Sequence, residues 1–283
     1  MSAMRIGVTA FLTDLAMAPE ALARAAEDRG YYSLYLPEHT HLPVSGARPP
    51  SLVDGVHVED YRRSLDPFTA LAAAAAVTDR ILLGTGIALV AQHDPIVLAK
   101  QIATLDHLSG GRFVLGMGYG WNRQEAADHG VDFSARRAIA REKVLCMQAL
   151  WAQDEASFDG QWVSLAPSYA WPKPVQRPRV RTLIGGGAGP KLFAAIADYA
   201  DGWMPIGGAG VADSLADLRR AFEEAGRDPG TLQVVPFGTV PSQGKLEHYA
   251  SLGVTEVVLR VPSGRDDEMQ RVLDDYARFL SPV

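Results

Sequence analysis

The chain contains almost no cysteine, because Cys146 is the single one among its 283 residues. One cysteine excludes an intramolecular disulfide and any metal cluster held by several cysteines. Cys146 lies inside the apolar, helix-like segment REKVLCMQALW, a setting that favours a small core residue over a reactive thiol. We therefore expect Cys146 to be buried in the core.

Long apolar runs are also missing. The longest, Phe68 to Val77, is mostly alanine and is about half of the roughly 20 residues that a membrane span needs. The first residues, MSAMRIGVTAF, contain no extended apolar stretch of the kind that forms a secretory signal. These absences predict a soluble, cytoplasmic protein with no membrane partner.

Positive charge is in the minority. Lys and Arg total 27 against 33 Asp and Glu, which gives a formal net charge of −6. A broad nucleic-acid surface needs a basic face to neutralise phosphates, so we expect no nucleic-acid partner.

What the chain does contain is a regular alternation of strand-like and helix-like segments. Its length allows two average domains or one large core. Pro19, Asp66-Pro67 and Asp94-Pro95 are typical helix starts. The expected strands are residues 5–11, 33–37, 80–90, 112–118, 181–186, 202–207, 232–238 and 255–261.

Each expected strand is followed by an expected helix, and no linker rich in glycine, serine or charge interrupts the series. Eight such units predict an α/β fold, a single (β/α)8 TIM barrel over residues 1–283. A doubly wound open sheet is the alternative, but it usually has fewer strands. We expect an extended loop at about 38–65 and a hairpin with a connector at about 156–180.

In such a barrel the loops after the strands carry the chemistry. PEHTH (37–41) follows the second expected strand and holds Glu38, His39 and His41. Histidine is the side chain best suited to moving a proton near neutral pH, so His39 is the favoured proton donor or ring contact. His41 is interpreted as a residue at the pocket mouth. The remaining histidines are scattered and form no ligand motif, so no metal is expected.

Glycines gather at three further strand ends. Gly86 interrupts an aliphatic strand, which is typical of a bulge or of a close ligand approach. LGMGYGWN (115–122) combines bare backbone with aromatic side chains that suit a planar ring system. GGGAGPK (185–191) precedes a helix whose first N–H groups would face an anion, although a simple tight turn explains these glycines equally well. Neither segment matches a Walker or dinucleotide-binding fingerprint.

Taken together, these segments resemble the bacterial luciferase-like flavin-dependent oxidoreductases, and most closely the branch that uses the deazaflavin coenzyme F420. The resemblance rests on the order and spacing of several weak motifs along nearly the whole chain. They are SLYLPEHTHLP, DPFTALAAAAAVTDRILLGTGI, HDPIVLAKQIATLDHLSGGRFVLGMGYGW, FDGQW, PKPVQRP, LIGGG and ADGWMP.

The resemblance implies a (β/α)8 barrel and a cofactor site at its loops. It implies a non-prolyl cis peptide at Gly86–Ile87 behind the central ring, with the acid–histidine pair Glu38-His39 near the reactive atoms. The implied catalytic residues are His39 and Glu38. The implied cofactor contacts are His39, Gly86, Ile87, Gly118, Tyr119, Gly120, Trp121, Asn122, Gly186, Gly187, Ala188 and Gly189.

The activity implied is hydride transfer between F420 and a small organic substrate, with His39 giving or taking the compensating proton. An FMN-dependent monooxygenase is the alternative, and it would draw reduced flavin from a separate reductase. A barrel that binds flavin without turnover is a second alternative. The resemblance also implies a homodimer.

Overall fold

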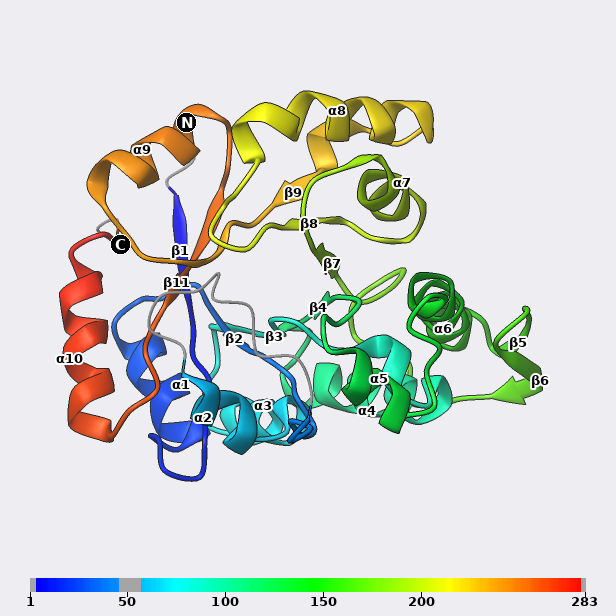
Figure 1. Cartoon of the computed structure of the whole chain (residues 1–283), viewed down its shortest axis with the longest axis horizontal. Coiled ribbons are helices and arrows are strands. Elements are labelled where there is room, and N and C mark those ends of the chain that lie inside the picture. Colours follow the sequence, from blue (N-terminus) through cyan, green and yellow to red (C-terminus); the bar gives the residue numbers. More distant parts are fainter. Residues whose placement is uncertain (1–3, 46–56, 281–283) are drawn as a thin grey trace.

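The computed structural model describes residues 4–45 and 57–280. Its main sheet is parallel, with the strand order β10-β11-β1-β2-β3-β4-β7-β8-β9 (Figure 1). The strands are β1 (Arg5–Thr9), β2 (Ser33–Leu36), β3 (Leu82–Thr85), β4 (Phe113–Met117), β7 (Thr182–Gly185), β8 (Gly202–Met204), β9 (Gln233–Val234), β10 (Phe237–Thr239) and β11 (Glu256–Arg260).

The two ends of this sheet are successive pieces of one chain segment, since only Val235 and Pro236 separate β9 from β10. Hydrogen bonds continue across the interruption on both sides. Val235 N donates to Trp203 O at 2.9 Å, and Val258 N donates to Pro236 O at 2.9 Å. The sheet therefore closes on itself, as the predicted (β/α)8 barrel requires.

Helices cover the outside of the barrel, and side chains fill its inside. Tyr35, Val114 and Leu183 belong to the interior cluster, whereas a larger cluster packs between sheet and helices. The α-helices are α1 (Pro19–Asp28), α2 (Val58–Arg63), α3 (Pro67–Ala75), α4 (Pro95–Leu108), α5 (Arg123–Asp128), α6 (Arg136–Ala152), α7 (Pro190–Tyr199), α8 (Val211–Glu224), α9 (Gln243–Ser251) and α10 (Asp266–Ala277). Short 3-10 turns are η1 (Val90–Gln92) and η2 (Pro229–Thr231).

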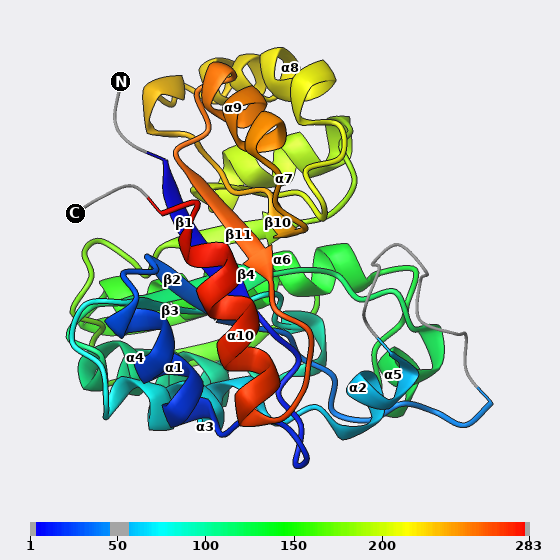
Figure 2. The same ribbon diagram turned by 90° about the vertical axis from the view of Figure 1, so that its left-hand side faces the viewer.

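The helix starts follow the expected capping chemistry. The Asp66 carboxylate accepts from Thr69 N, and the Asp94 carboxylate accepts from Ile96 N and Val97 N. Each carboxylate thus satisfies amide groups that have no partner within the helix. Figure 2 shows α10, the last helix, beside α1, and β11 pairs with β1, so the two ends of the described chain lie side by side.

Two expected strands are wrong in extent. The third, expected at 80–90, ends at Thr85, because at Gly86 the chain bulges away from its partners and then forms η1. The seventh, expected at 232–238, is broken into β9 and β10, because Pro236 has no N–H to donate to the ladder.

The region expected as a hairpin with a connector contains a hairpin, and the expected loop contains a short helix. Residues 155–169 form an antiparallel hairpin of β5 (Glu155–Asp159) and β6 (Ser164–Tyr169), which stands out beyond α6 in Figure 1. Within the expected loop 38–65, α2 is helical, while residues 46–56 lie outside the described part of the chain. Among the described residues no helix combines the length and apolarity that crossing a membrane requires.

Candidate active site

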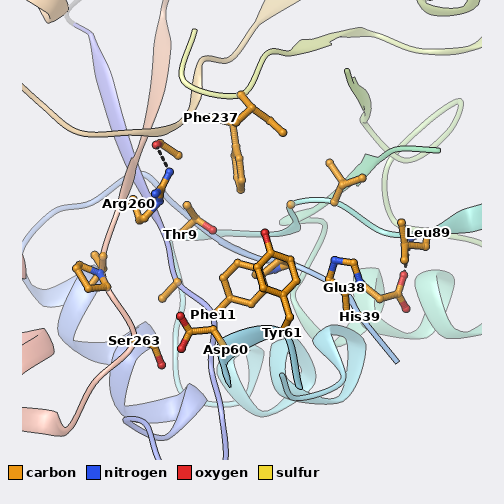
Figure 3. A pocket seen from close by; sticks show the side chains of 18 of the residues that line it. Thr9, Phe11, Glu38, His39, Asp60, Tyr61, Leu89, Phe237, Arg260 and Ser263 are labelled. Atoms are coloured by element: carbon orange, nitrogen blue, oxygen red, sulfur yellow. Dashed lines mark hydrogen bonds between the residues drawn. The ribbon is translucent and has the colours of Figure 1, made fainter. Parts of the chain in front are cut away.

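A pocket opens among the loops that follow the strands, which is the end where a barrel of this kind carries its chemistry. Figure 3 shows Phe237 pointing into it from the side opposite Phe11 and Tyr61. The pocket encloses about 160 Å³. Its lining residues are Thr9, Ala10, Phe11, Pro37, Glu38, His39, Asp60, Tyr61, Gly86, Ile87, Leu89, Gly120, Trp121, Ile206, Phe237, Gly238, Arg260, Val261, Pro262 and Ser263.

His39 is held in the wall of this pocket by a buried carboxylate. Its Nδ1 lies 3.0 Å from both carboxylate oxygens of Glu125, which comes from α5. The side chains are 8% and 0% exposed, respectively. An ionised carboxylate only accepts hydrogen bonds, so this contact assigns the ring proton to Nδ1. Nε2 has no hydrogen-bond partner among the described residues, and the ring lines the pocket.

Aromatic rings surround His39. Tyr61 lies edge-on at 5.0 Å between ring centroids, and Trp121 lies at 5.7 Å. Tyr61 also contacts Trp121 at 6.0 Å and Phe11 at 4.7 Å. Burial raises the pKa of the Tyr61 hydroxyl, so this ring stays neutral at physiological pH. The histidine is therefore packed in a largely aromatic wall.

Glu38 is buried as well, but it contacts a different element from His39. Its Oε2 accepts from Leu89 N at 2.5 Å, and its Oε1 lies 2.7 Å from His93 Nε2. Both partners come from the segment after β3. Glu38 thus fastens that segment to the end of β2, and both of its oxygens are already engaged.

The Gly86–Ile87 peptide bond is cis, which confirms that prediction. Gly86 N donates to Leu36 O at 2.8 Å, whereas Ala88 N donates to Gly116 O at 2.7 Å, so the hydrogen bonds switch from β2 to β4 across the bulge. A Cβ on Gly118 would lie 2.0 Å from Ile87 Cδ1, and one on Gly185 would lie 3.0 Å from Ile87 Cγ2. The Ile87 side chain therefore fills the space that these two glycines leave.

The turn after β4 divides into residues that face the pocket and residues that do not. Gly120 and Trp121 line the pocket. Tyr119 instead pairs its hydroxyl with that of Tyr199 at 2.7 Å. Asn122 caps α5 through its Oδ1, and its buried Nδ2 has no partner among the described residues.

The glycine turn after β7 lies beyond Ile87. Gly186 O accepts from Trp203 Nε1 at 2.9 Å. A Cβ on Gly187 or Gly189 would meet nothing within 4 Å, so the backbone there has open space beside it, and α7 starts directly afterwards at Pro190. Gly186, Gly187, Ala188 and Gly189 are therefore adjacent to the first turn of a helix but outside the pocket lining.

Sequence reasoning missed Glu125, Tyr61, Phe11 and Phe237. Tyr61 lies within the segment 38–65 that was expected as a loop, and Glu125 lies on the short helix α5. The available signal was the N-x-x-E spacing from Asn122 to Glu125, which marks a helix start and a residue that can turn inward. His41 lies 3.0 Å from Asp128 of α5, and it is not among the residues that line the pocket. Among the described residues no cluster of three or more His, Cys, Asp or Glu could hold a metal ion.

Comparison with known proteins identifies the family. The model of the luciferase-like monooxygenase family matches residues 17–247. An uncharacterized protein of Mycobacterium tuberculosis is 44% identical over 281 residues, which cover 98% of this chain and 99% of the relative. The chain therefore belongs to the luciferase-like monooxygenase family, whose members are flavin- or deazaflavin-dependent oxidoreductases.

Solved structures show the same fold. The monooxygenase RslO1 from Streptomyces bottropensis superposes with a TM-score of 0.79 at 22% identity, covering 98% of each chain. An F420-dependent secondary alcohol dehydrogenase in complex with an F420-acetone adduct superposes with a TM-score of 0.77 at 17% identity, again covering 98% of each. One of these neighbours is a monooxygenase and the other is an F420-dependent dehydrogenase, so the likeness shows the barrel fold that they share.

Proposed function

We propose that this protein is an F420-dependent oxidoreductase that transfers hydride between the deazaflavin and a small organic substrate. The observation that carries the proposal is His39, a histidine locked on one ring nitrogen by Glu125 while the ring lines an apolar pocket. Hydride chemistry on an alcohol or carbonyl needs a proton to move together with the hydride, and a positioned imidazole supplies it. The likeness to an F420-dependent secondary alcohol dehydrogenase supports the same chemistry.

The residues present fit a planar cofactor with an anionic tail. Gly86 and Gly120 offer bare backbone in the pocket wall. A Cβ on Gly86 would lie 2.3 Å from Phe237 Cζ, so the wall is closely packed there and needs glycine. Gly187 and Gly189 leave room beside the start of α7, where backbone N–H groups favour an anion. We propose that Gly186, Gly187, Ala188 and Gly189 hold the phosphate.

Two further sets of residues complete the proposed contacts. Ile87 and Trp121 would border the ring, and Gly118, Tyr119 and Asn122 would border its tail. Asn122 brings a donor, Nδ2, that has no hydrogen-bond partner within the described part of the chain.

When bound, F420 supplies a ring carbon that accepts or donates hydride. The protein's part is to orient the substrate and to move the proton. In the oxidising direction His39 Nε2 takes the hydroxyl proton, and in the reducing direction it returns it. Glu38 acts by holding the segment 86–93 against β2 through Leu89 and His93. Tyr61 and Trp121 keep water away from the reacting atoms.

Titration of the purified protein with F420 and with FMN tests the cofactor. We expect submicromolar binding of F420, followed by turnover with small secondary alcohols or ketones that is read from the deazaflavin absorbance. Replacing His39 by Ala should leave F420 affinity within about twofold but lower kcat by about 10²–10⁴, the usual contribution of a general acid or base. Tight FMN binding without F420 affinity would overturn the proposal.

The second candidate is an FMN-dependent monooxygenase that receives reduced flavin from a separate reductase, and the likeness to RslO1 favours it. It predicts substrate oxygenation when reduced FMN and oxygen are supplied. A flavin-binding barrel without turnover would show binding but no dependence of any rate on His39.

A further inference from the structure

Glu125 holds His39 from outside the sequence motif that contains the histidine. Its carboxylate is fully buried and lies 3.0 Å from Nδ1 through both oxygens. A buried carboxylate is costly unless it is paired and hydrogen-bonded. The Glu125 carboxylate, a strong hydrogen-bond acceptor, is thus placed specifically against Nδ1 of His39.

We propose that Glu125 is a positioning residue that fixes the Nδ1–H tautomer of His39, so that Nε2 is left as the acceptor at the pocket. This inference rests on the proposed function for its catalytic meaning, but its structural content does not. Neutral imidazole has one donor and one acceptor nitrogen, and the partner of one nitrogen decides the state of the other. With Nδ1–H on the carboxylate, a substrate hydroxyl can give its proton to Nε2 while its carbon loses hydride to F420. In reverse, the protonated ring returns that proton as the carbonyl carbon gains hydride.

The contacts around Glu125 indicate that it orients the His39 ring and does not merely attach the segment after β2 to α5. Two other contacts join the segment after β2 to the end of α5. His41 Nε2 lies 3.0 Å from Asp128 Oδ2, and Thr40 Oγ1 lies 2.7 Å from Nε2 of His129, the residue that follows the helix. These outer contacts are exposed. They attach the segment from outside, whereas Glu125 makes the hydrogen-bonding contact to the His39 ring in the pocket wall.

The direct test is the tautomer of His39 in the wild-type protein without cofactor. Long-range ¹H–¹⁵N correlation spectra distinguish the two nitrogens, and the His39→Gln variant identifies the signal among the seven histidines. We expect protonation at Nδ1. A neutral ring protonated at Nε2, which would require Glu125 to be the donor, overturns the proposal whether or not the protein uses F420.

Three variants separate orientation from structure. Glu125→Gln retains an acceptor oxygen, so we expect the tautomer to be kept and kcat to fall less than tenfold. Glu125→Leu removes the acceptor, so we expect a changed tautomer and a kcat at least about tenfold lower, within the range of a lost general acid or base, at a KM within about twofold. Asp128→Asn is the control one turn further along α5, and its kcat should stay within about twofold.

The outcomes are separable. If Glu125→Leu keeps both the tautomer and kcat, or if Asp128→Asn loses as much activity as Glu125→Leu, Glu125 has no specific positioning role. If Glu125→Leu does not fold, the wild-type tautomer and the Glu125→Gln variant still decide. If the wild-type protein turns over no substrate with F420, the proposed function fails, while the tautomer measurement continues to test the role of Glu125.

Discussion

The bulge at Gly86 permits a quantitative test of the pocket wall. Replacing Gly86 by Ala would place a Cβ 2.3 Å from Phe237 Cζ, 2.5 Å from Phe237 Cε2 and 3.1 Å from Tyr35 Cβ. Carbon atoms pack at about 3.5–4.0 Å, so the Phe237 ring has to retreat by roughly 1 Å or more. Phe237 and Tyr35 belong to the barrel interior, where overpacking costs about 1–3 kcal/mol.

We therefore expect Gly86→Ala to lower the unfolding free energy by about 1–3 kcal/mol, which corresponds to a fall in Tm of roughly 2–12 °C for a domain of this size. Chemical denaturation followed by circular dichroism measures the first quantity, and calorimetry measures the second. Because Gly86 and Phe237 both line the pocket, cofactor affinity should fall as well.

The matched control is Gly187→Ala, since a Cβ there meets nothing within 4 Å, and its stability should remain within about 0.5 kcal/mol of the wild type. A second control combines Gly86→Ala with Phe237→Leu, which removes the ring that the new methyl group meets. The double variant should lose at least about 0.5 kcal/mol less than the sum of the single losses. Additive losses, or a fully stable Gly86→Ala, would refute the steric reasoning.

Three further predictions concern the rest of the molecule. Glu27 accepts from three backbone N–H groups of residues 79–81, which outweigh the effect of burial and lower the pKa of its carboxyl. Glu27→Gln should therefore cost about 1–3 kcal/mol at pH 7. In urea titrations the difference should shrink as the pH falls from the ordinary Glu pKa of about 4.3 through the lowered pKa of the folded state. Burial raises the pKa of the Cys146 thiol to about 11, so iodoacetamide should label it, by mass spectrometry, only after unfolding. Val97 and Leu108 are exposed apolar residues of α4. If the protein is the expected homodimer and α4 forms its interface, the double variant Val97→Asp, Leu108→Asp should be monomeric in light scattering. An intact dimer would exclude this face of α4 as the interface.

Much of the fold was predictable because local sequence patterns determine its strands and helices. Alternating β-rich and helical segments gave the eight units and their order, and Asp-Pro pairs such as Asp66-Pro67 marked helix starts. The errors lie where local pattern carries no information. Residues 80–90 are nearly all apolar, and a strand buried on both faces has no alternation to show where it leaves the sheet. Only Gly86 signalled the bulge.

The site was predictable in part for the same reason. Loops after successive strands meet at one end of a barrel, so His39, Gly86 and Trp121 were expected near one another, and all three line the pocket. The partner of His39 was not predictable. Glu125 lies 86 positions further along, and β3 stands between β2 and β4 in the sheet. Whether its side chain reaches across depends on tertiary packing.

Glu125 also shows how one local rule gives way to a contact in the site. In a capping box, a Glu three residues after the cap returns its carboxylate to the backbone of the cap. Here the Asn122 side chain accepts from Glu125 N at 3.2 Å, as the capping box requires. The Glu125 carboxylate, however, lies within hydrogen-bond distance of His39 Nδ1 and not of the cap backbone. Glu125 thus contacts a residue of the pocket wall instead of stabilising the start of its own helix.

Glu38 and His39 were read from the sequence as one acid–histidine unit, and the geometry separates them into two. Side chains of neighbouring residues on an extended segment project in different directions, so adjacent groups rarely face each other. Glu38 accordingly pairs with His93 and holds the segment after β3, while His39 pairs with Glu125 from α5. The dipeptide joins the loops of β3 and β4 to the end of β2. A substitution at Glu38 should therefore disturb the position of the bulge, whereas one at Glu125 should disturb the state of the ring, and the two effects are distinguishable by cofactor affinity and kcat, respectively.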